Sequence, residues 1–143
     1  MERAPYPFEV EILERFSRGG KFAASPKGEW VRGYLLTFKE GYSYEMWKEY
    51  TQFASHLGIN PGTYISFKRY MWILKKLGLI RLVRRERVVR GFRKSFYAIT
   101  PGMENSPIWR RPGQTMYPSL DWTIKPYEVK RALRARTSPS LRA

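Results

Sequence analysis

The chain has 143 residues, of which 43% are hydrophobic and 16% aromatic, and its formal net charge is +15. A chain of this length and composition is expected to fold around a core of its own rather than stay disordered. The absence of cysteine excludes disulfides, thiol catalysis and cysteine metal sites. No apolar run approaches the length of a membrane-spanning helix, about 18 residues, and the N-terminus lacks the pattern of a signal peptide. We therefore expect a cytoplasmic protein without a membrane partner.

The positive charge is concentrated in one part of the sequence. Residues 1–67 carry eight basic and eight acidic side chains, whereas residues 68–94 carry eleven basic side chains and one acidic one. A second basic stretch, residues 110–143, has eight basic and two acidic side chains. Such clustering is typical of proteins that bind polyanions. It favours that role over a surface whose like charges only keep the protein soluble.

Two amphipathic helices are predicted in the first 41 residues. One lies within residues 6–20 and is stopped by Gly19-Gly20, and the next follows Ser25-Pro26 and ends at Gly41. Their apolar positions are Phe8, Ile12, Leu13 and Phe16 in the first helix and Val31, Tyr34, Leu35 and Phe38 in the second.

Residues 43–78 predict two further helices joined by a short turn. In the first, Ser43 is the expected N-cap and Gly58 the left-handed residue that follows the helix. In the second, Asn60 is the expected cap, Pro61 suits the first helical position, and Gly78 ends the helix. The expected buried stripes are Trp47, Tyr50, Ala54 and Leu57 in one helix and Phe67, Tyr70, Met71, Leu74 and Leu77 in the other.

A basic β-hairpin is predicted directly after these helices, with its tight turn at Gly91. Near its base, apolar side chains are expected to face the core: Ile80, Leu82, Tyr97 and Ile99. The tip, RRERVVRGFRK, is almost entirely charged. Burying unpaired guanidinium groups costs several kcal/mol, so we expect these arginines to point away from the core. If the polyanion is DNA, Arg87, Arg90 and Arg93 near the tip are the candidates for contact with the minor groove or the backbone.

The helix-turn-helix followed by this hairpin resembles the winged helix-turn-helix of prokaryotic transcription regulators of the MarR and PadR kind. The resemblance covers residues 43–102. The segments that carry it are Phe53-Ala54, Leu57-Gly58-Ile59, Ser66 to Met71, Leu74, Gly78-Leu79-Ile80, and Tyr97 to Thr100. It implies an α+β, mainly helical fold in which the hairpin is the wing and the preceding helix enters the major groove of DNA. It also implies a homodimer held by terminal segments.

The predicted DNA-binding residues come from the second helix of this unit and from the hairpin. They are Thr63, Tyr64, Ser66, Lys68, Arg69, Trp72, Lys75, Lys76, Arg84, Arg85, Arg87, Arg90, Arg93 and Lys94. Two of the aromatic residues have structural alternatives: Trp72 is either exposed to stack on sugars or buried against a neighbouring element, and Tyr64 either contacts DNA or packs at the helix entry. His56 is expected to be structural, and Glu45 with Glu49 makes a poor metal site.

Three regions follow from these patterns. Residues 1–25 form a helical extension, residues 26–102 form the winged helix-turn-helix domain, and residues 103–143 form a strap rich in proline and aromatic residues with a basic tail. Repeated prolines exclude a long helix or a central strand from the strap. Its rings, among them Trp109, Tyr117, Trp122 and Tyr127, are expected to dock on the domain or on a partner.

These observations predict a nucleoid-associated transcription regulator that binds double-stranded DNA sequence-specifically and without a cofactor, and the resemblance implies that it does so as a homodimer. The alternative is a structural nucleic-acid-binding protein that coats DNA or sits on RNA or the ribosome through the same basic surface. An enzyme such as a nuclease is not expected, because the chain has one Asp, one His and no Cys, and a catalytic carboxylate or zinc cluster is hard to build from them.

Overall fold

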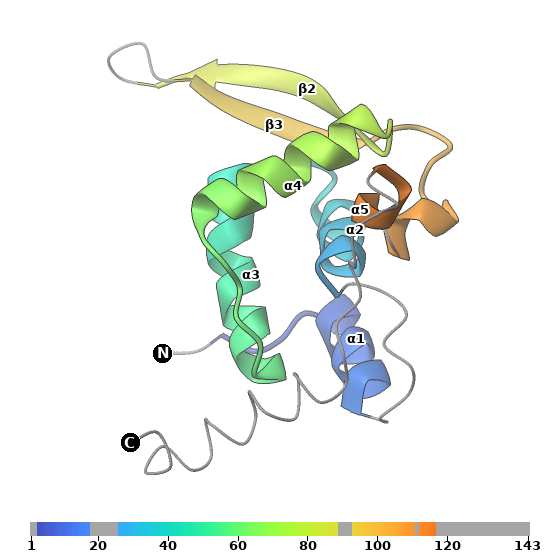
Figure 1. Cartoon of the computed structure of the whole chain (residues 1–143). Coiled ribbons are helices and arrows are strands. Elements are labelled where there is room, and N and C mark those ends of the chain that lie inside the picture. Colours follow the sequence, from blue (N-terminus) through green and yellow to red (C-terminus); the bar gives the residue numbers. More distant parts are fainter. Residues whose placement is uncertain (1–2, 18–25, 89–92, 111, 117–143) are drawn as a thin grey trace.

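The computed structural model describes residues 3–17, 26–88, 93–110 and 112–116 (Figure 1). Its fold is mixed α+β and mainly helical, as predicted. The elements are α1 (Pro7–Ser17), α2 (Pro26–Phe38), β1 (Gly41–Tyr42), α3 (Ser43–Leu57), α4 (Tyr64–Lys76), β2 (Ile80–Arg87), β3 (Arg93–Ile99), the 3-10 helix η2 (Pro107–Arg110) and α5 (Pro112–Met116). The order from α2 to β3 is compatible with a winged helix.

The starts of α3 and α4 differ from the sequence-based prediction. Thr63, not Asn60, is the N-cap of α4, and its hydroxyl accepts a hydrogen bond from the Ser66 amide at 3.1 Å. Asn60 instead accepts from the Gly62 amide at 2.9 Å and shapes the preceding turn. Ser43 is the first residue of α3 rather than its cap. The prediction for the other end of α3 is confirmed: Gly58 has a left-handed φ of 72°.

The three strands form one antiparallel sheet in the order β1-β3-β2. In the hairpin, Ile80 lies opposite Ile99 and Leu82 opposite Tyr97, and an irregularity between Leu82 and Arg84 shifts the register toward the tip. Ile80 is buried, and Tyr97 and Ile99 pack against the core, which confirms their predicted orientation. The predicted turn at Gly91, together with Arg90, lies outside the described residues.

Aromatic rings from several helices form the centre of the core. The Trp30 ring on α2 lies 5.3 Å from that of Tyr50 on α3, and the Tyr50 ring lies 5.8 Å from that of Phe67 on α4.

Trp109 on η2 is 1% exposed and donates from its indole N–H to the Met103 carbonyl at 2.7 Å. The first part of the predicted strap therefore packs on its own chain. Its other predicted docking residues, Tyr117, Trp122 and Tyr127, lie outside the described residues.

Buried Glu9 ties the N-terminal segment to this core. Its carboxylate is 1% exposed and accepts two hydrogen bonds from Arg3, at 2.7 and 3.0 Å. It also accepts from the Tyr6 amide at 2.8 Å and from the Trp30 indole at 2.7 Å. Burial alone would raise the pKa of Glu9, but the hydrogen bonds from Arg3, Trp30 and the Tyr6 amide outweigh it and hold that pKa below its ordinary value.

Gly28 lies where α2 packs closely against η2. A Cβ at this position would lie 2.2 Å from the Trp109 carbonyl oxygen and 2.8 Å from the Tyr70 hydroxyl. Helix propensity alone predicts that Gly28→Ala stabilises the protein by about 1 kcal/mol. The steric conflict predicts the opposite, a loss of about 1–3 kcal/mol, measurable by urea unfolding. A gain in stability in that assay would contradict the packing of η2 on α2.

Candidate nucleic-acid interface

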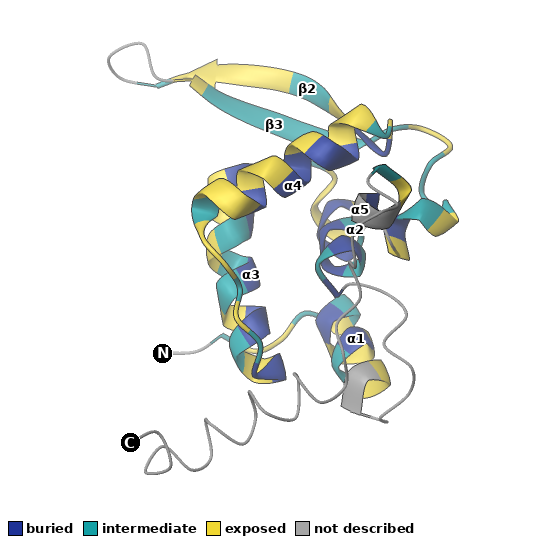
Figure 2. Cartoon of the chain, viewed as in Figure 1, coloured by how far each residue is buried: buried dark blue, intermediate teal, exposed yellow. Residues whose placement is uncertain are grey.

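Helix α4 has one buried face and one exposed face. Phe67, Tyr70, Met71, Ile73 and Leu74 are buried. The outward side chains, most of them predicted to bind DNA, are all exposed (Figure 2): Ile65, Ser66, Lys68, Arg69, Trp72, Lys75 and Lys76. Trp72 is 48% exposed, so the alternative in which it is buried against a neighbour does not hold. Leu77, predicted in the buried stripe, follows α4 as its C-cap and is half-buried.

The exposed face of α4 is positively charged without local compensation, because the helix contains no acidic residue. Two of its lysines lie over aromatic rings instead: Lys68 Nζ is 5.5 Å from the centre of the Tyr64 ring, and Lys76 Nζ is 5.5 Å from that of Trp72. No ion pair to Lys68, Arg69, Lys75 or Lys76 occurs among the described residues. These cations are therefore available to an external anion.

Two hairpin residues that were predicted to contact DNA, Arg84 and Lys94, form ion pairs within the protein. Arg84 pairs with Glu40 at 2.7 Å and with Glu86, and its guanidinium carbon lies 3.8 Å from the centre of the Phe96 ring. The hydrogen bonds to Glu86 and Glu40 raise the pKa of Arg84. Lys94 Nζ lies 3.6 Å from a carboxylate oxygen of Glu45. Both pairs neutralise part of the charge that the sequence assigns to the hairpin.

Four other arginines of the hairpin are exposed, namely Arg81, Arg85, Arg87 and Arg93. None of them has an ion pair within the part of the chain that the structure describes. Arg87 and Arg93 lie directly opposite each other on β2 and β3. Like charges in such cross-strand positions are destabilising, so an anion placed between them would relieve a repulsion that the free protein carries.

Thr63 and Tyr64, both predicted DNA contacts, also have structural roles. Thr63 caps α4. The Tyr64 ring packs against Tyr44 at 5.1 Å and against Trp47 at 5.7 Å, and its hydroxyl lies 3.3 Å from that of Ser43. The structural alternative for Tyr64, packing at the helix entry, is therefore observed.

Sequence reasoning missed two exposed members of this surface. Ile65 is 65% exposed, more than any other large hydrophobic side chain in the described part of the chain, and it lies two helical turns before Trp72 on the same side of α4. Arg81 is exposed at the start of β2. The seven-residue spacing from Ile65 to Trp72, off the buried stripe, is the signal that could have identified Ile65.

Searches against protein-family models, curated proteins and solved structures give no significant match to this chain. Across the described ranges, no helix is both long and apolar enough to cross a bilayer. No group of three or more potential metal-ligating side chains comes together in that same part of the molecule. The fold and the basic surface on α4 and the hairpin are therefore the basis for a functional proposal.

Proposed function

We propose that the protein is a winged helix-turn-helix regulator that binds double-stranded DNA, with α4 as the recognition helix and the β2–β3 hairpin as the wing. The observation that carries the proposal is the exposed, acid-free face of α4, next to a hairpin with four exposed arginines that have no ion pair among the described residues. Keeping so many like charges together costs electrostatic energy, and a phosphate backbone is the partner that offsets it.

The dimensions of α4 suit the major groove. A helix of 13 residues is about 20 Å long, and the major groove, about 12 Å wide, admits one α-helix. Lys68, Arg69 and Lys75 would then contact phosphates or base edges, while Ile65 and Trp72 supply apolar contacts to thymine methyl groups or sugars. The hairpin would lie across the flanking backbone or the minor groove.

The first test is the salt dependence of binding to duplex DNA. With about 6 to 8 phosphate contacts, the logarithm of the binding constant should fall with the logarithm of the salt concentration at a slope of roughly −5 to −7. Fluorescence anisotropy with a labelled duplex at several salt concentrations measures this slope. A slope near zero would contradict electrostatic binding through the lysines and arginines of α4 and the hairpin.

Sequence specificity separates a regulator from a protein that coats DNA or binds RNA. A regulator should prefer one duplex sequence over random DNA by a factor of about 10³ or more. Selection of bound fragments from a random duplex pool provides that sequence, and competition with random DNA and with RNA measures the preference. A palindromic consensus would also favour the homodimer, because the symmetry of the site mirrors the two-fold symmetry of the protein.

A further inference from the structure

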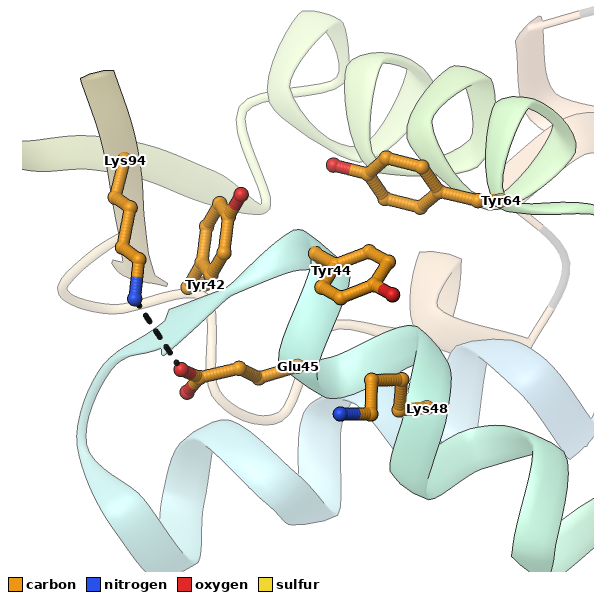
Figure 3. Close-up of a pocket in the computed structure, with 6 residues that line it drawn as sticks. All are labelled: Tyr42, Tyr44, Glu45, Lys48, Tyr64 and Lys94. Carbon is orange, nitrogen blue, oxygen red and sulfur yellow. Dashed lines mark ion pairs between the residues drawn. The ribbon is translucent and has the colours of Figure 1, made fainter. Parts of the chain in front are cut away.

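Three tyrosines and two lysines surround a pocket between the start of α4 and the hairpin (Figure 3). Its volume is about 490 Å³, within the range of small-ligand sites. Four elements contribute to it: β1, α3, α4 and β3. The lining residues are Tyr42, Tyr44, Glu45, Lys48, Tyr64 and Lys94.

The walls of this pocket are aromatic. The ring centres of Tyr44 and Tyr64 are 5.1 Å apart with the ring planes nearly perpendicular, and those of Tyr42 and Tyr44 are 6.4 Å apart. Tyr44 is 40% exposed, so a flat ligand can reach it. Tyr42 is buried, and burial together with the neighbouring Tyr64 raises the pKa of Tyr42.

Two lysine ammonium groups lie close to the aromatic rings of the pocket. Lys48 Nζ lies 5.6 Å from the centre of the Tyr44 ring, and Lys94 Nζ lies 5.2 Å from that of Tyr42. Glu45 is the one acidic residue of the lining and pairs with Lys94 at 3.6 Å. Exposed pairs of this length contribute little stability, so Lys94 can exchange Glu45 for an incoming anion.

Flat aromatic walls and flexible cations together match a nucleotide, whose base stacks on a ring while its phosphate pairs with an ammonium group. The position of the pocket favours a nucleotide that belongs to a longer strand. Tyr64 is the first residue of α4, and its ring lies 5.5 Å from Nζ of Lys68 on the exposed face of that helix. Lys94 on β3 brings a cation of the hairpin to the same pocket. A phosphate alone would not require the aromatic walls.

We propose that this tyrosine pocket binds an unpaired nucleotide of the bound DNA, with its base against Tyr44 and its phosphate near Lys48 and Lys94. A base within an intact duplex has both faces covered by its neighbours, so the occupant must have left the stack, as in a bulge or a mismatch. This inference rests on the proposed DNA binding and adds a preference for locally unpaired sites.

The test compares two short duplexes of the same sequence, one fully paired and one with a single bulged 2-aminopurine. The wild-type protein should bind the bulged duplex at least about fivefold more tightly, from the stacking of one base on an aromatic side chain, and should quench the 2-aminopurine fluorescence. Tyr44→Ala should abolish both effects while its affinity for the paired duplex stays within about twofold of wild type. Tyr44→Phe should retain both effects.

Phe38→Ala is the matched control, because Phe38 is 41% exposed and contacts Tyr6 and Tyr34 rather than the pocket. It should behave as wild type. Equal affinity of the wild type for both duplexes, or a bulge preference that persists in Tyr44→Ala, would overturn the inference and leave the proposed DNA binding in place. Absence of salt-dependent binding to either duplex would instead overturn the proposed function and this inference with it.

Discussion

Replacing Lys68 and Lys75 together by glutamate is expected to lower the affinity for duplex DNA by about 100-fold at moderate salt. Both side chains lie on the exposed face of α4, two helical turns apart. Under the proposed function, each reversal would remove a phosphate contact and add a repulsion. The slope of the logarithm of the binding constant against that of salt should become shallower by about 2. Fluorescence anisotropy across a salt series measures both quantities.

The control for this variant changes the net charge equally at another part of the surface. Arg15 on α1 and Lys39 after α2 are both exposed, and Arg15→Glu with Lys39→Glu should reduce affinity only slightly. Equal losses in the two variants would mean that binding follows net charge rather than the surface formed by α4 and the hairpin. Circular dichroism of each variant would show that the helices remain folded.

Glu9→Gln is expected to lower the free energy of unfolding by about 3 kcal/mol at neutral pH. The wild-type carboxylate accepts hydrogen bonds from Arg3, the Tyr6 amide and Trp30 while almost fully buried. A glutamine of the same shape keeps one acceptor, but it turns a donor toward this set of donors and leaves Arg3 with only its longer ion pair, to Glu49 at 3.6 Å. Because Arg3 is partly exposed, water can solvate it. The expected loss of unfolding free energy therefore lies at the lower end of the range that is typical when a buried ion pair is broken.

The same pair predicts a dependence on pH. The folded-state pKa of Glu9 lies below its ordinary value of 4.5, so its stabilisation is fully present above that value and is lost as the pH falls through the folded-state pKa. The stability difference between the wild type and Glu9→Gln should therefore shrink on acidification, as measured by urea unfolding at several pH values. Glu11→Gln, an exposed change on the same helix, should stay within about 0.5 kcal/mol of wild type. A difference that is constant with pH would show that the Glu9 carboxylate contributes no pH-linked stability.

The sequence predicted most elements of this fold because their signals are local. Apolar spacing located α1 to α4, and glycines at the helix ends, such as Gly58, marked where the chain turns. Strand β1 was missed because it consists of only Gly41 and Tyr42, whose pairing with β3 depends on a segment more than fifty residues away. The predicted caps at Ser43 and Asn60 were wrong for different reasons. The N-cap of α3 is Tyr42, which makes no side-chain cap hydrogen bond, so residue type gives no signal there. Two suitable residues, Asn60 and Thr63, precede α4, and only Thr63 accepts from the Ser66 amide.

The features of the candidate site that the sequence did not predict depend on tertiary contacts. The sequence located the basic residues. The structure shows which of them form ion pairs with Glu40, Glu45 and Glu86. No local pattern marks Glu9 as buried, because one of its hydrogen-bond donors, the Trp30 indole, belongs to another helix. The tyrosine pocket combines residues from β1, α3, α4 and β3, so no local pattern could have identified it.

Lysine footprinting on bound DNA tests the central claim most directly, because exposed lysines occur both on α4 and elsewhere. The full chain would be treated with an amine-acetylating reagent, free and in complex with duplex DNA, and each lysine quantified by mass spectrometry. We predict that DNA protects Lys68, Lys75 and Lys76, while Lys39 reacts equally in both states. Protection of Lys39 with unchanged reactivity of the three α4 lysines would contradict the assignment of α4 to the DNA-binding surface.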